Sequence, residues 1–526
     1  MMRLSRFIWM SLLLLPASVV VAAESANRAS PAPERDMVAW YRQPAQAWLD
    51  AMPLGNGLMG AMVFGGVQKE RIALNESSFC SGRPHDYDDP NAGKYFSQIR
   101  ELVFAGKFQE AEKMADEHFW GIPKNQQAYQ PLDDLQLAFD GVVNATDYRR
   151  ELDMEPGVAK VTYRVGDAVF TREIFISYPD RVMVIHLTAD KPGRISVQGQ
   201  FTSPYLETAT ATPGKLVVDG CWKGPMKPNG LIATVDGKGE RFQTALLALP
   251  EGGQSEAADG TVRIKGANSL TLIVTAATSF INYHDISGDP GAACERVLAD
   301  IKGQDYTTLR RRHEDDFRGL MGRVHLAVGD SVMNQKPTDE RLKSMRDGGA
   351  DPNLEALCFQ FGRYALACSS AIGKWMDTRR PGGGFPSVWY TSMWSRLERG
   401  DKAAQFTTAF VSRAAANNLH NRGSNQSDAT FGYTAGVAEA LLQSHAGEIS
   451  LLPALPTGWS DGSVNGLRAR GGFEVSMQRH GGKLQSAEIR SVNGGSCKVR
   501  YGQKLASLVV RPGEIARLKS DLARSN

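Results

Sequence analysis

The chain has 526 residues, 42% of them hydrophobic, and a formal net charge of +3 from 60 basic against 57 acidic residues. This length predicts two to four domains at about 100–200 residues each, and the composition is that of a globular protein. The near balance of charges argues against a nucleic-acid partner and against binding to an anionic membrane surface.

The first 23 residues have the features of a targeting segment. Two arginines precede an apolar run from Phe7 to Val21, and Ala22-Ala23 supplies small residues for cleavage. The run is shorter than the ~20 residues of a membrane span and contains Pro16. We therefore expect a cleaved signal peptide over residues 1–23, a linker over residues 24–36, and an exported (periplasmic or secreted) protein with no membrane insertion after cleavage.

Short strand patterns predict a β-sandwich over residues 37–280. The segment Val158–Val165 alternates apolar and polar residues, and similar segments follow it, separated by Gly, Pro and Asp. A helical insert interrupts this region. Its two parts, Tyr95–Phe104 and Phe108–Phe119, carry apolar residues at helical spacing, with Gly106 between them.

Helical patterns replace the strands after residue 280. A helical linker is expected over residues 281–350, with helices at Cys294–Ile301 and Tyr306–Met321 that Asp289 and Asp305 cap. A helical region follows over residues 351–446, and strand patterns return in a C-terminal β-domain over residues 447–526. The helices expected in the helical region are Leu354–Ser369, Thr391–Leu397, Ala403–Ala415 and Tyr433–His445. The fold class is therefore multidomain α+β.

Several segments occur in an order that points to one family. The main ones are Leu54-Gly55-Asn56-Gly57, Glu70-Arg71-Ile72-Ala73-Leu74-Asn75-Glu76, Phe361-Gly362-Arg363-Tyr364 and Leu442-Gln443-Ser444-His445-Ala446-Gly447-Glu448. Together they resemble glycoside hydrolase family 95, the inverting α-L-fucosidases and their α-L-galactosidase relatives. The resemblance implies an N-terminal β-sandwich, a helical linker, an (α/α)6 catalytic barrel, a C-terminal β-domain and an oligosaccharide or glycan substrate.

The helical region is shorter than that resemblance requires. Twelve barrel helices with their loops need about 250–350 residues, whereas residues 351–446 leave room for about four or five helices. After Ser369-Ser370 the family's asparagine-bearing segment is absent, and the similarity resumes at Phe385. We therefore expect a truncated (α/α)6-type barrel, of which residues 351–446 are the remnant.

An inverting glycosidase needs a general acid and a general base, with carboxyl groups about 6.5–9.5 Å apart. By the resemblance, Asp428 is the candidate base, although Ala429 and Thr430 replace the glycine and asparagine of the family motif. A helix is expected just after Asp428, and a helix N-terminus keeps a carboxylate ionised, as a base requires. The alternative is that Asp428 only caps this helix.

No residue of the chain matches the family's general acid, which therefore stays unknown. The carboxyl groups of this region are Glu355, Glu398, Glu439 and Glu448, and we expect structural roles for Glu439 and Glu448. His445 is expected in the core, and Asn417-Asn418 lies in the wrong context to replace the lost asparagines. The tryptophans that either stack on sugars or pack in the core are Trp375, Trp389, Trp394 and Trp459.

The nine histidines form no cluster at metal-ligand spacing, and no phosphate loop or dinucleotide fingerprint occurs, so the sequence predicts no metal and no cofactor.

The resemblance and the short helical region together lead to two functional hypotheses. The first is a hydrolase that removes terminal L-fucose from glycans by inversion, with weak or no activity. The alternative is an inactive relic that binds carbohydrate or serves a structural role, and a third interpretation is a longer gene product. A missing barrel block also predicts exposed apolar helix faces and a tendency to dimerise or aggregate.

Overall fold

The computed structural model describes residues 36–86, 88–122, 127–223, 239–322, 324–369, 385–421 and 427–525. The expected signal segment, nearly all of the expected linker and Trp375 lie outside these residues. From Asp36 onward the chain forms one compact unit. Its described part contains an N-terminal β-sandwich, a set of helices and a C-terminal β-domain, as the sequence predicts.

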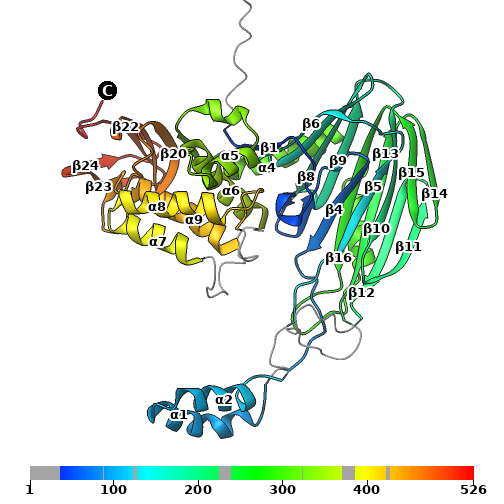
Figure 1. The fold of residues 1–526 in the computed structure, drawn as a ribbon, viewed down its shortest axis with the longest axis horizontal. Coiled ribbons are helices and arrows are strands. Elements are labelled where there is room, and N and C mark those ends of the chain that lie inside the picture. The colour runs from blue at the N-terminus through cyan, green and yellow to red at the C-terminus, as the bar shows by residue number, and fades with distance from the viewer. Residues whose placement is uncertain are drawn as a thin grey trace, which may run out of the picture. The chain divides into compact units, whose positions relative to one another are not determined.

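Two antiparallel sheets pack face to face in the sandwich (Figure 1). In spatial order, the larger sheet consists of β1 (Val38–Tyr41), β6 (Thr146–Asp153), β7 (Val158–Val165), β8 (Ala168–Ser177), β9 (Val182–Ala189), β16 (Ser269–Thr278), β13 (Arg241–Glu251), β12 (Lys215–Cys221) and β11 (Leu206–Thr212). The smaller sheet consists of β14 (Gln254–Ala258), β15 (Thr261–Ala267), β10 (Ile195–Thr202), β5 (Asp133–Phe139), β4 (Lys69–Glu76), β3 (Met59–Val63) and β2 (Met52–Gly55). Alternate side chains of both sheets, such as Val161 and Leu135, are fully buried in one apolar core.

The helical insert lies between β4 and β5. It consists of the short 3-10 helix η2 (Ala92–Tyr95), α1 (Phe96–Phe104) and α2 (Phe108–His118), and we call it the helical hairpin. Gly106 has a φ of +73° in the turn between the two helices, which explains the glycine there. The two predicted helices are confirmed within one residue at each end.

The linker helices begin where the sequence places acidic caps. The helix α3 (Pro290–Asp300) starts with an Asp289 carboxylate that accepts from the Ala292 amide at 3.0 Å. The helix α4 (Tyr306–Met321) starts in the same way at Asp305, at 2.8 Å from the Thr308 amide. The chain then forms β17 (His325–Val328), η3 (Ser331–Gln335) and α5 (Thr338–Arg346).

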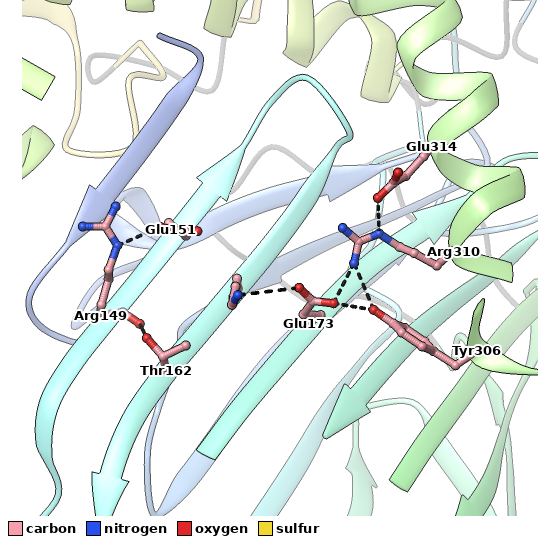
Figure 2. A network of polar contacts seen from close by, with 8 residues as sticks. Arg149, Glu151, Thr162, Glu173, Tyr306, Arg310 and Glu314 are labelled. Carbon is pink, nitrogen blue, oxygen red and sulfur yellow. Dashed lines mark hydrogen bonds and ion pairs between the residues drawn. The ribbon is translucent and has the colours of Figure 1, made fainter. Parts of the chain in front are cut away.

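A polar network fixes α4 on the outer face of the larger sheet (Figure 2). Arg310 Nη1 donates to Glu173 of β8 at 2.6 Å, and its Nε donates to Glu314 at 2.6 Å. The Tyr306 hydroxyl also donates to Glu173. Burial alone would raise the pKa of Glu173, but the hydrogen bond from Tyr306 and the charge of Arg310 lower it. The network therefore holds an ionised carboxylate beneath the helix.

The described helical region contains α6 (Pro352–Ser369), α7 (Phe385–Arg396), α8 (Gly400–Ala409), a π-helical turn (Phe410–Ala414) and α9 (Ser427–Leu441). The prediction of a helix over Tyr433–His445 was wrong at both ends. The helix α9 begins earlier, and β18 (Leu442–Gln443) follows it because these residues pair with β19 (Ile449–Leu451). As a result His445 is exposed, and the prediction of a core histidine was also wrong.

Two further sheets form the C-terminal β-domain. The first contains β17, β20 (Gly462–Ala469), β21 (Phe473–His480), β22 (Lys483–Ser491) and β25 (Ile515–Lys519). The second contains β18, β19, β23 (Gly495–Tyr501) and β24 (Lys504–Val510), in which β19 and β23 run parallel. Linker strand β17 thus belongs to a C-terminal sheet, although the two are far apart in the sequence.

The Leu54-Gly55-Asn56-Gly57 segment is the place where α6 packs against the sandwich. A side chain at Gly55 would place its Cβ 2.7 Å from the Cys368 carbonyl oxygen, so only glycine fits. The Gly57 amide donates to the same oxygen at 2.8 Å, with a φ of +80° at Gly57. Asn56 closes the turn by accepting from the Met59 amide at 2.8 Å. This motif therefore has a packing role between the sandwich and the helices.

Candidate functional site

The candidate base Asp428 lies in the first turn of α9 and is exposed to solvent. The sequence predicted a position just before the helix, and the earlier start of α9 places Asp428 inside it instead. Free backbone amides at the start of a helix stabilise a negative charge there. An exposed, ionised carboxylate is what a general base requires, and a carboxylate that only stabilises the helix start would occupy the same place.

A half-buried histidine fixes the residue next to Asp428. His420 Nδ1 lies 3.1 Å from the Asn421 carbonyl oxygen, and its Nε2 lies 3.4 Å from Ser427 Oγ. Because a carbonyl oxygen only accepts, the proton belongs on Nδ1, and neutral His420 accepts from the serine hydroxyl. Burial lowers the pKa of His420, which favours this neutral form. The pair therefore anchors the beginning of α9 and, with it, Asp428.

The two neighbouring asparagines hold the same loop against the N-terminal strands. Asn417 Nδ2 donates to Asp50 Oδ1 at 2.6 Å, and the Asn417 carbonyl accepts from the Tyr41 hydroxyl at 2.6 Å. Asn418 Nδ2 donates to the Ala51 carbonyl at 3.3 Å. Both side-chain amides thus serve contacts between the helical region and the sandwich.

Burial raises the pKa of the Glu355 carboxyl group on α6. Its Oε1 accepts from Thr408 at 2.5 Å and its Oε2 accepts from Trp459 Nε1 at 2.6 Å. A raised pKa is the property that a general acid needs. However, both oxygens are occupied by neutral donors and the residue is only 6% exposed. In this arrangement a sugar oxygen does not reach it.

The other glutamates of the region lie at the surface. Glu439 forms two hydrogen bonds with Arg396, at 2.5 and 2.8 Å. Glu448 is paired with Arg500, and the hydrogen bond from this arginine lowers the pKa of Glu448. Glu398 is exposed, with a φ of +56°. The general acid stays unidentified, because Glu355 is enclosed by its two donors, and Glu439 and Glu448 are paired with arginines.

The tryptophans divide between packing and exposure. Trp459 is 1% exposed, so it packs in the core, whereas Trp389 is 56% exposed and Trp394 is half-buried.

Two carboxyl groups that the sequence analysis did not single out are buried, those of Asp133 and Glu240. Burial raises the pKa of each to about 7. Nothing in the sequence around Asp133 indicated its burial.

In the described ranges, no group of three or more His, Cys, Asp or Glu side chains is arranged to hold a metal ion. Over the same ranges, the helices lack the combined length and apolar character that crossing a bilayer requires.

Comparison with known families adds the decisive observation. The sequence model of the glycosyl hydrolase family 95 catalytic domain matches residues 305–379, and that of the glycoside hydrolase family 95 C-terminal domain matches residues 443–520. These two stretches of the chain are similar to glycoside hydrolase family 95. The N-terminal domain of glycosyl hydrolase family 65 matches residues 39–283. Asp428 lies between the two family 95 matches.

Two curated relatives named as fucosidases align with part of the chain. "Alpha-L-fucosidase 2" of Arabidopsis thaliana is 32% identical over 354 residues, which are 63% of this chain and 42% of the relative. "Probable alpha-fucosidase A" of Aspergillus oryzae is 25% identical over 61% of this chain and 45% of its own length. The alignments thus span less than half the length of these relatives.

A solved structure supports the fold. "Putative kojibiose phosphorylase from human microbiome" superposes with a TM-score of 0.51 at 8% identity, covering 92% of this chain and 98% of its own. At this identity the similarity concerns only the fold.

Proposed function

We propose that this chain is an exported glycoside hydrolase of α-L-fucosidase type, which removes terminal L-fucose from glycans by an inverting mechanism. The observation that carries the proposal is the pair of family 95 matches, together with relatives named as α-L-fucosidases. Export rests on the N-terminal sequence pattern, and a truncated (α/α)6-type barrel rests on the length of the helical region.

In the proposed reaction, Asp428 acts as the general base. Its carboxylate takes a proton from a water molecule, and the water oxygen attacks the anomeric carbon on the face opposite the leaving group. A carboxylic acid gives its proton to the leaving oxygen as the glycosidic bond breaks. The exposed position of Asp428 in the first turn of α9 leaves its carboxyl group accessible to a water molecule, as the first step needs. The second step has no assigned residue, so we expect slow turnover.

Three glutamates of this region are already held by other side chains of the chain. This favours a second candidate function, a catalytically inactive protein that binds carbohydrate or has a structural role. Glu355 is enclosed by Thr408 and Trp459, and Glu439 and Glu448 are paired with arginines. An inverting hydrolysis without a protonated carboxyl group loses the assistance to its leaving group, which is worth about 10²–10⁴ in rate.

The test is release of free L-fucose from a terminal α-1,2-fucosylated oligosaccharide by the purified mature chain. Asp428→Asn should abolish the release, because the amide does not accept the proton of water. Asp401→Asn is the matched control, since Asp401 is also an exposed residue in the first turn of a helix, α8, where it pairs with Arg399. Release that survives Asp428→Asn contradicts its role as base. No release from folded protein favours the inactive alternative, which titration with the same oligosaccharide then tests.

A further inference from the structure

One tryptophan of α7 lies in solvent although the helix itself packs into the helical region. Val388, Thr391 and Ser395 of this helix are fully buried, whereas the side chain of Trp389 is 56% exposed. A large aromatic side chain stabilises a fold mainly through the apolar area that it buries. Packing alone therefore does not account for a tryptophan at this position.

The contacts of α7 with α9 show that the two helices run parallel. Thr391 lies against Gly436, where an added Cβ would be 2.8 Å from the threonine methyl group. Ser395 Oγ, one turn later, donates to the Gly436 carbonyl oxygen at 3.3 Å. Arg396 then donates to Glu439 at 2.5 and 2.8 Å. Contacting residues thus advance in the same direction along both helices, so the two helices begin at the same end of the pair.

This register places Trp389 near the candidate base. At about 1.5 Å per residue, α9 rises about 12 Å from Asp428 to Gly436, and α7 rises about 3 Å from Trp389 to Thr391. Trp389 and Asp428 therefore differ by about 9 Å along the helix axes, and the axes of packed helices lie about 8–10 Å apart. The two residues are thus on the order of 15 Å from each other.

The indole of Trp389 suits a sugar ring as its ligand. The face of an aromatic ring is negative, so it attracts the weakly positive C–H groups on one face of a sugar ring, while the sugar hydroxyl groups stay in water. Asp428 is the proposed base at the terminal fucose. A ring on the order of 15 Å from it is within reach of the sugars next to that fucose.

Two further exposed side chains of α7 would suit a different ligand, another protein. Met393 is 44% exposed and Leu397, just after the helix, is 64% exposed, and both continue the row that begins with Trp389. The aromatic member of this row is the one nearest the beginning of α9, where Asp428 lies. This placement favours the glycan, and a protein contact is an outcome of the test.

We propose that Trp389 is a binding residue for the part of the glycan that carries the terminal fucose, and that its ring stacks on one of these sugars. The inference rests on the proposed function, because it takes Asp428 as the position of the reacting sugar. It is tested by binding, which is measured separately from hydrolysis.

The first experiment is a calorimetric titration with a terminal α-1,2-fucosylated oligosaccharide. The chain itself is used if it releases no fucose, and Asp428→Asn is used otherwise, so that the ligand is not consumed. Adding Trp389→Ala should weaken binding by about three- to tenfold. Trp389→Phe keeps an aromatic face and should retain most of the affinity. Trp120→Ala is the matched control, because Trp120 is 50% exposed and follows α2, and it should leave the affinity unchanged.

A second measurement reports on the tryptophan ring itself. The chain is labelled with fluorotryptophan, and the fluorine signal of Trp389 is assigned by its loss in Trp389→Phe. This signal should shift when the oligosaccharide is added and stay in place when free L-fucose is added. A tryptophan that only supports the fold gives no such ligand-specific shift.

Three outcomes would overturn the proposal. One is full affinity in Trp389→Ala, and another is a chain that does not bind the oligosaccharide. The third is a molecular mass, measured by light scattering, that falls in Trp389→Ala while the affinity stays the same, which would assign the row to a protein contact. Binding that depends on Trp389 without any fucose release would leave this inference standing and remove only the proposed hydrolysis. Fucose release by Trp389→Ala with an unchanged KM would do the reverse.

Discussion

Trp459 donates a hydrogen bond from its indole Nε1 to Oε2 of Glu355 at 2.6 Å, which joins the C-terminal β-domain to α6. Both side chains are buried, and Thr408 of α8 supplies the second hydrogen bond to the carboxyl group. Tyr433 of α9 donates to the Glu355 carbonyl oxygen at 3.0 Å. One residue of α6 thus connects three other elements.

Trp459→Phe should destabilise the fold by about 1–3 kcal/mol, because it leaves a buried carboxyl oxygen without its donor. Burial raises the pKa of Glu355, so its ionisation costs stability as pH rises. The indole N–H favours the ionised form, and the loss should therefore be larger at about pH 8 than at about pH 5. Urea unfolding at both values measures it, and an equal loss at both would contradict this account of Glu355.

Asp133→Asn should remove a pH dependence of stability. The Asp133 carboxyl is buried, with Thr244 as its donor at 2.7 Å, and burial raises its pKa from 3.8 to about 7. Between these values the folded chain binds more protons than the unfolded chain, so the free energy of unfolding falls as pH rises. The fall is roughly 1.4 kcal/mol for each pKa unit. Denaturant titrations across this range should show a shallower slope for Asp133→Asn than for Asp147→Asn, a change at an exposed site.

Arg341→Ala should cost about 3–5 kcal/mol, because it leaves a buried carboxylate without its cation. Arg341 is 1% exposed and binds Asp351 through two nitrogens at 2.8 and 2.9 Å. The exposed pair of Arg42 and Glu340, at 2.7 Å, provides the contrast. Arg42→Ala should change stability by less than about 1 kcal/mol. Chemical unfolding of both variants compares the pairs, and similar losses would contradict the role of burial.

Gly157→Ala should destabilise more than Gly166→Ala. Both glycines have positive φ, +69° and +59°, so each substitution carries a backbone cost of about 1–2 kcal/mol. At Gly157 the new Cβ would also lie 2.9 Å from the Phe317 ring, whereas nothing lies within 4 Å at Gly166. The difference between their unfolding free energies isolates the clash with α4. Equal values would mean that Phe317 moves aside without cost.

The sequence predicted the order of sheets and helices well, because that information is local. Alternation in Val158–Val165 and the cap at Asp305 depend on neighbouring residues, and both occur as expected. The C-terminal end of α9 was misplaced for the opposite reason. Leu442-Gln443 continues an apolar helical pattern, but pairing with β19 makes these residues a strand.

In the candidate site, too, some features follow from local sequence and others only from tertiary contacts. The sequence by itself indicated the resemblance to the family and gave Asp428 as a candidate base, because motifs are linear and can be read without knowledge of contacts. Only the tertiary structure placed Asp428 in the first turn of α9, enclosed Glu355 between Thr408 and Trp459, and left Trp389 of α7 exposed. Burial and hydrogen-bond partners arise where segments distant in the sequence meet, and these contacts set the pKa and accessibility of a side chain.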